Sequence, residues 1–113
     1  MNIKNYLNQK VNVKIDRPLG SKHPKFSEIL YPINYGFIPN TLAEDGEEID
    51  AYIVGVDFPV EEFIGNVIAV IIRKNDVENK LVVAPDNTSF TKDEIYKQVL
   101  FQERFFDFEV LIK

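Results

Sequence analysis

Residues 31–50 read YPINYGFIPNTLAEDGEEID and divide into a stiff aromatic half and an acidic half. The aromatic half places three aromatic residues, two prolines, an asparagine and a glycine within nine residues. The acidic half carries five carboxylates within seven residues, namely Glu44, Asp45, Glu47, Glu48 and Asp50. Carboxylates held this close raise one another's pKa, and a hard cation such as Mg²⁺ relieves their repulsion. The stretch therefore predicts a Mg²⁺ site that handles phosphate.

Three of these carboxylates are spaced so that they can converge on one cation. Asp45 and Glu47 flank Gly46 in the bend, and Asp50 opens the apolar run that follows. A cation held by this set could make a bound water more acidic. The competing interpretation is a solvated acidic turn. Asp50 favours the metal site, because a partly buried carboxylate needs a partner.

Composition bounds the class of protein and excludes several kinds of site. The chain has 113 residues, which predicts a single domain over 1–113. It has no cysteine and a single histidine, His23, which excludes thiolate sites and zinc sites built from several imidazoles. The net charge of −5 disfavours a nucleic-acid partner. No apolar run reaches bilayer length and no hydrophobic leader is visible, so we expect no membrane partner and a cytoplasmic location.

The rest of the chain reads as short strands followed by one late helix. Alternating or continuous apolar residues predict strands near 11–15, 35–38, 49–56, 63–73, 81–84 and 106–112, with Gly65 as a bulge or bend. Thr91 and Glu94 have the spacing of a capping box and predict a helix that begins there. The expected fold is mainly β (α+β), a small closed barrel with one C-terminal helix packed against it.

Phosphate recognition requires cations near the acidic loop. The candidates are Lys22, Lys25, Arg73, Lys74 and Lys80. Lys80 is the strongest, because it begins a strand directly after a turn that carries Asp76 and Glu78. Tyr31 and Tyr35 lie in the stiff segment, where their hydroxyls could orient a phosphate or satisfy a hydrogen bond in the core.

The 31–50 stretch resembles the signature of the soluble (family I) inorganic pyrophosphatases, approximately YPxNYGxIPxTxxxDGDPxD. Residues 78–85, ENKLVVAP, are similar to a second family segment, D-x-K-x-x-x-x-P. The resemblance implies an OB-like closed barrel with a flanking helix. It also implies an enzyme, an inorganic diphosphatase that uses Mg²⁺ to hydrolyse pyrophosphate to two phosphates. Members of this family often assemble, so a homo-oligomer is an expectation.

Carried over by position, the resemblance implies a role for each matching residue. The implied metal ligands are Asp45, Asp50 and Glu78. Glu47 falls where the family has an Asp that helps to activate the attacking water, and Tyr35 is the second implied catalytic residue. The implied substrate-binding residues are Lys80, Tyr31, Lys22 and Arg17.

Departures from the family pattern leave alternatives open. Glu replaces Asp at positions 47 and 78, Glu48 replaces a proline, and the N-terminal charged hairpin is contracted. A wider mouth would suit another phosphoanhydride or a nucleotide as the substrate. The two longer carboxylates would also suit a catalytically weak descendant that binds phosphate or a protein.

Overall fold

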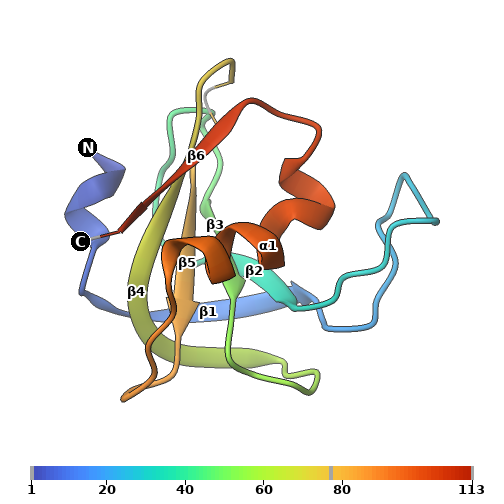
Figure 1. The fold of residues 1–113 in the computed structure, drawn as a ribbon, viewed down its shortest axis with the longest axis horizontal. Helices are drawn as coiled ribbons and strands as arrows, with labels where there is room; N and C mark the ends of the chain where they lie inside the picture. Colours follow the sequence, from blue (N-terminus) through green and yellow to red (C-terminus); the bar gives the residue numbers. More distant parts are fainter. Residues whose placement is uncertain (1, 77, 113) are drawn as a thin grey trace.

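A computed structural model describes residues 2–76 and 78–112, and its five central strands close into a barrel. The barrel strands are β1 (Lys10–Arg17), β2 (Asn34–Ile38), β3 (Ile49–Ile53), β4 (Glu62–Arg73) and β5 (Lys80–Ala84). They follow the order β1-β2-β3-β5-β4, and pairing of β1 with β4 closes the ring (Figure 1). The β3–β5 pair is parallel and the other pairs are antiparallel. This arrangement confirms the predicted fold class.

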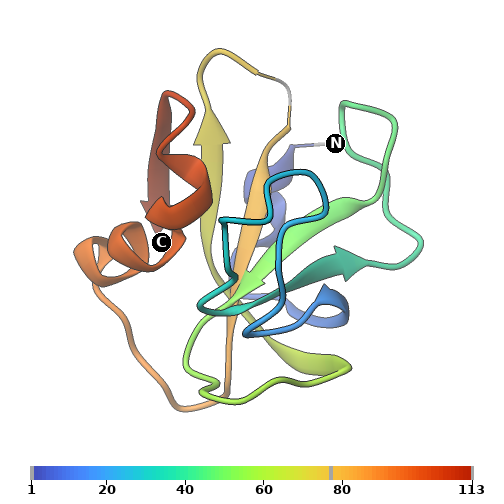
Figure 2. The same ribbon diagram turned by 90° about the vertical axis from the view of Figure 1, so that its right-hand side faces the viewer.

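Three further elements lie outside the barrel. A 3₁₀ helix, η1 (Ile3–Tyr6), precedes β1, and strand β6 (Phe108–Ile112) pairs antiparallel with β4. The one α-helix of the described residues, α1 (Lys92–Glu103), lies beside β6 on one side of the barrel (Figure 2). Across the part of the chain that the structure describes, no helix has the length and apolar character needed to cross a membrane.

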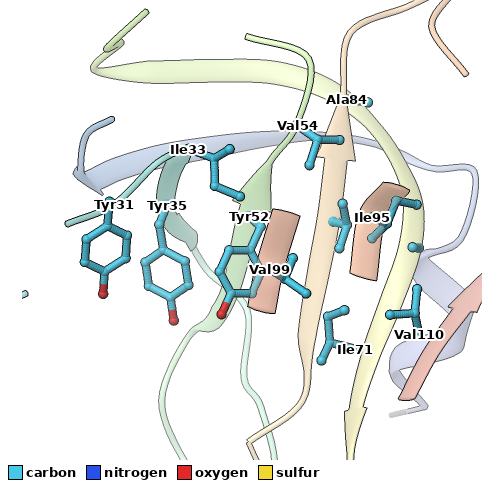
Figure 3. Packing of buried hydrophobic residues seen from close by; sticks show 12 residues of the cluster. Tyr31, Ile33, Tyr35, Tyr52, Val54, Ile71, Ala84, Ile95, Val99 and Val110 are labelled. Atoms are coloured by element: carbon cyan, nitrogen blue, oxygen red, sulfur yellow. The ribbon is translucent and has the colours of Figure 1, made fainter. Parts of the chain in front are cut away.

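Strands β2, β3 and β5 bury nearly all of their residues on both faces, and the two faces have different roles. The barrel interior is filled by residues such as Ala51, Ile53 and Leu81. The residues that alternate with them, including Tyr52 and Val82, point out of the barrel and pack against Ile95 and Val99 of α1. Figure 3 shows residues of this second cluster. Side chains on a strand alternate between faces, so Asp50 and Lys80 fall on the outward face, next to the helix.

Gly65, predicted to be a bulge or a bend, does not form a bulge. The pairing of β4 with β1 runs through Gly65 without interruption, and the register shift against β5 falls later, between Val67 and Ala69. A Cβ atom at Gly65 would lie 2.5 Å from the carbonyl oxygen of Ala84. Glycine is therefore needed here because two backbones approach closely.

The capping box at the start of α1 forms as predicted. Thr91 Oγ1 accepts a hydrogen bond from the Glu94 backbone N–H at 3.1 Å, and Glu94 Oε1 accepts one from the Thr91 backbone N–H at 2.8 Å. We expect Thr91→Ala to lower the free energy of unfolding by about 1 kcal/mol in urea titrations. Lys92→Ala, one residue later on the exposed surface, is the matched control. Equal losses in the two variants would contradict the capping role.

Candidate functional site

A cavity of about 590 Å³ opens between the outward face of the barrel strands and the end of α1. Its lining draws residues from several strands, including Arg17 of β1, Tyr35 of β2 and Asp50 of β3. The charged residues of the lining are Arg17, Glu28, Asp50, Arg73, Glu78, Lys80 and Arg104. Its large apolar residues are Phe26, Ile29, Phe105 and Phe106. The cavity therefore joins an ionic part to an apolar part.

Lys80 lies at the centre of the ionic part. Its side chain is only 2% exposed, and its Nζ lies 3.4 Å from Asp50 Oδ2 and 3.6 Å from Glu78 Oε2. Lys80 also donates a hydrogen bond to the Tyr35 hydroxyl, which itself donates to Asp50 Oδ2 at 2.8 Å. Burial and the neighbouring Asp50 raise the pKa of Tyr35 well above its usual value. Tyr35 therefore stays protonated and keeps the Asp50 carboxylate oriented.

Sheet register explains why these three residues meet. In the parallel β3–β5 pair, Ala51 lies opposite Leu81, so the preceding residues Asp50 and Lys80 are neighbours at the start of both strands. Tyr35 lies opposite Tyr52 in the adjacent β2–β3 pair, on the same outward face. Its ring therefore reaches along the sheet toward Asp50.

Arg73 supplies a second buried cation. Its Nε and Nη2 donate to the two carboxylate oxygens of Glu103 at 2.9 and 2.8 Å, and its Nη1 donates to Glu78 Oε2 at 2.7 Å. The guanidinium carbon lies 3.6 Å from the centre of the Phe106 ring. Burial acts to lower the pKa of Arg73, but the hydrogen bonds that Arg73 donates to Glu103, together with the negative charges of Glu103 and Glu78, outweigh it and raise the pKa. Arg73 is therefore a permanent positive charge held between Glu78 and Glu103.

A row of tyrosines continues the network behind the cavity. The hydroxyls of Tyr31, Tyr35 and Tyr52 point to the same side in Figure 3. Tyr52 donates to Glu103 Oε2 at 2.6 Å and accepts from Gln102 Nε2 at 2.8 Å. The hydroxyl of Tyr31 donates to Gln102 Oε1 at 2.7 Å. The end of α1 is therefore joined to the sheet by polar bonds.

Tyr31 also holds Arg17, one of the cavity cations. Arg17 Nη1 donates to the Tyr31 hydroxyl at 2.6 Å. Tyr31 is fully buried and is not part of the cavity lining among the described residues. The predicted phosphate contact of Tyr31 is therefore supported only through Arg17, which does line the cavity.

The structure brings some predicted site residues together and leaves others apart. Tyr35, Asp50, Glu78, Lys80 and Arg17 all line the cavity. Lys22 is exposed and lies outside that lining, as do Asp45 and Glu47. Asp45 Oδ1 instead accepts a hydrogen bond from the Glu47 backbone N–H at 3.0 Å within the exposed bend. The roles assigned to Lys22, Asp45 and Glu47 stay predictions.

Sequence reasoning missed the three residues that tie α1 to the site, Tyr52, Gln102 and Glu103. A signal for two of them was present, because Gln102 and Glu103 follow Val99 at the helical spacing that continues the apolar face of Ile95 and Val99. Polar residues that continue an apolar face are buried with it and must find polar partners.

Among the described residues, the structure brings the predicted metal ligands only partly together. Within residues 2–76 and 78–112, no group of three or more acidic, histidine or cysteine side chains is placed to hold a metal ion. The predicted set of Asp45, Asp50 and Glu78 is therefore not assembled in this structure. Asp50 and Glu78 do share the cavity, and Mg²⁺ often binds through one or two carboxylates together with substrate phosphates. Asp50 and Glu78 are therefore the two predicted metal ligands that the cavity brings together.

Comparison with known proteins identifies the family. Residues 2–103 match the family model described as inorganic pyrophosphatase. The chain belongs to the inorganic pyrophosphatase family. The resemblance that the signature motif indicated is confirmed.

Relatives in this family are longer than this chain. The inorganic pyrophosphatase of Nostoc sp. is 37% identical over 81 residues, which cover 66% of this chain and 43% of that protein. That of Saccharolobus solfataricus is 44% identical over 43 residues, which cover 38% of this chain and 22% of that protein. The chain thus spans less than half the length of these relatives.

Solved structures of family members share the fold. The crystal structure of an inorganic pyrophosphatase from Neisseria gonorrhoeae aligns with a TM-score of 0.64 at 25% identity, covering 83% of this chain and 72% of that one. The inorganic pyrophosphatase of Ehrlichia chaffeensis aligns with a TM-score of 0.72 at 20% identity, covering 94% and 87%. The second likeness concerns the fold alone.

Proposed function

We propose that this protein binds inorganic pyrophosphate in the cavity and hydrolyses it to two phosphates in a Mg²⁺-dependent reaction. The observation that carries the proposal is the bonded group of Tyr35, Asp50 and Lys80 on the cavity wall of a pyrophosphatase-family chain. All three belong to the two family segments of the sequence.

The charge of the cavity supports an anionic ligand. Among the described residues of the lining, four cations face three carboxylates, whereas the whole chain carries a net charge of −5. The cations are Arg17, Arg73, Lys80 and Arg104, and the carboxylates are Glu28, Asp50 and Glu78. Glu103, outside the lining, already balances Arg73, so the cations left to attract an anion are Arg17, Lys80 and Arg104.

In the proposed mechanism, Asp50 and Glu78 would hold Mg²⁺, which when bound screens the charge of the phosphates and makes a water molecule more acidic. Lys80 would bind a phosphate oxygen and balance the negative charge that develops as the anhydride bond breaks. Tyr35 would hold Asp50 in place through its hydrogen bond. Glu47 would accept a proton only if the bend at 40–48 approaches the cavity, and Asp45 would join the metal by the same movement.

A second candidate function, phosphate binding without turnover, is favoured by one observation. Glu78 already accepts a hydrogen bond from Arg73, and Asp50 and Glu78 both lie beside Lys80. Cations of the chain thus neutralise both carboxylates proposed to hold Mg²⁺. Because their negative charge is already compensated, Asp50 and Glu78 gain less from binding a metal ion.

The measurement that tests the proposal is phosphate release from pyrophosphate, with Mg²⁺ and with EDTA. We expect release with Mg²⁺ and none with EDTA, because hydrolysis requires the charge of the phosphates to be screened. Calorimetric titration of pyrophosphate accompanies the assay. Pyrophosphate binding without phosphate release, with Mg²⁺ and with EDTA, would favour phosphate binding without turnover over the enzyme. Neither binding nor release would overturn both candidates.

A further inference from the structure

The apolar part of the cavity has no counterpart in pyrophosphate. Phe26 and Phe105 both line the cavity, and they are 52% and 61% exposed. Ile29 and Phe106 extend the same apolar surface inward. Pyrophosphate is charged over its whole surface, so it would leave these rings in contact with water. A ligand with an apolar portion would cover them.

The cavity is also larger than pyrophosphate requires. Its volume of about 590 Å³ lies within the range of roughly 300–1,000 Å³ that holds drug-sized organic molecules. Two linked phosphoryl groups occupy only the ionic end of such a space. The rest of the lining includes the apolar residues Phe26, Ile29, Phe105 and Phe106.

Both aromatic rings are placed beside groups that suit a planar ligand. His23 Nδ1 accepts hydrogen bonds from the backbone N–H groups of Lys25 and Phe26 at 3.0 and 3.2 Å, and the His23 and Phe26 ring centres lie 5.2 Å apart. The guanidinium carbon of Arg104 lies 5.0 Å from the centre of the Phe105 ring. Each ring therefore has a defined neighbour at the edge of the ionic part.

We propose that the cavity binds a nucleoside diphosphate or triphosphate, with the base against Phe26 and Phe105. Its phosphates would contact the cavity cations Arg17, Lys80 and Arg104. Base stacking on aromatic side chains is favourable for every base, so these contacts select the class of ligand rather than one base. The inference rests on the proposed function, since it assigns the organic part of the ligand at the same phosphate site.

The test compares ADP with pyrophosphate by calorimetric titration, each with Mg²⁺ and with EDTA. We expect Phe105→Ala and Phe26→Ala each to weaken ADP binding about 5- to 150-fold, the range that loss of one stacking contact implies. Phe26→Ala should leave the pyrophosphate affinity unchanged, and Phe105→Ala should lower it less than the ADP affinity, since the Arg104 guanidinium lies over the Phe105 ring. Phe105→Leu keeps an apolar side chain and removes only the aromatic face, so it should also weaken ADP binding. Phe58→Ala is the matched control, because Phe58 is 62% exposed and outside the lining.

The outcomes separate this inference from the proposed function. Pyrophosphate binding without ADP binding overturns the inference and leaves the proposed function in place. ADP binding that Phe26 and Phe105 variants do not affect also overturns it, because the base then lies elsewhere. Absence of binding by both ligands, with the protein folded, removes the proposed function as well.

Discussion

Asp50→Asn is expected to lower Mg²⁺-dependent phosphate release from pyrophosphate by at least about 100-fold, a loss typical of removing one charged group from a catalytic site. Asp50 is one of the two carboxylates proposed to hold Mg²⁺, and its oxygen accepts the hydrogen bond of Tyr35. Asparagine keeps the shape and an acceptor for Tyr35 but removes the negative charge. Steady-state assays at saturating Mg²⁺ measure the change.

The variant should remain folded, which makes the result interpretable. Lys80 retains the Tyr35 hydroxyl and Glu78 as neighbours when Asp50 loses its charge. Asp93→Asn is the matched control, because Asp93 lies on the surface of α1 with its side chain 73% exposed, and it should keep full activity. Full activity in Asp50→Asn would place the chemistry somewhere other than this cavity.

Glu103→Ala is expected to lower the free energy of unfolding by about 3–5 kcal/mol, as expected when one partner of a buried ion pair is removed. Glu103 is fully buried, and its carboxylate accepts two hydrogen bonds from Arg73 and one from Tyr52. Alanine leaves the Arg73 guanidinium buried with only part of its charge compensated, and it removes the acceptor of the Tyr52 hydroxyl. Urea unfolding of the variant and the parent measures the loss.

Two further variants separate charge from hydrogen bonding in this loss. Glu103→Gln keeps one carbonyl acceptor and removes the charge, so its loss should be smaller than that of Glu103→Ala. Asp93→Ala breaks the ion pair with Lys97, in which both side chains are 73% exposed, and removes a negative charge from the first turn of α1, so it should cost at most about 1 kcal/mol. A Glu103→Ala loss no larger than that of Asp93→Ala would contradict the structural role of the buried pair.

Local sequence patterns were sufficient for most of the fold. The alternation of Val11, Val13 and Ile15 predicted β1, and the apolar run after Asp50 predicted β3. Thr91 and Glu94 marked the start of α1 because both partners of a capping box lie within one turn. Such signals depend on neighbours in the chain, so they are readable without the tertiary structure. The position of the register shift in β4 could not be read from the sequence, because it depends on how β4 pairs with β5.

The candidate site divides in the same way. Sequence motifs identified Tyr35, Asp50 and Lys80, and strand register then placed them side by side. The acidic bend itself was read as the centre of the metal site. In the structure Asp45 accepts a hydrogen bond from the Glu47 backbone N–H, as a short carboxylate in a tight bend readily does, and its metal role stays a prediction.

The sequence by itself determined the family and the closed barrel with its late helix, and it predicted the candidate site residues Tyr35, Asp50 and Lys80, which share one cavity. Only the tertiary structure decided that Arg73 and Glu103 form a buried ion pair across 30 positions of the chain, and that aromatic residues complete the cavity. The physical reason is that a motif records residues held close by the local backbone. Buried ion pairs and cavity linings, in contrast, form between segments that are distant in the sequence and meet only when the chain folds.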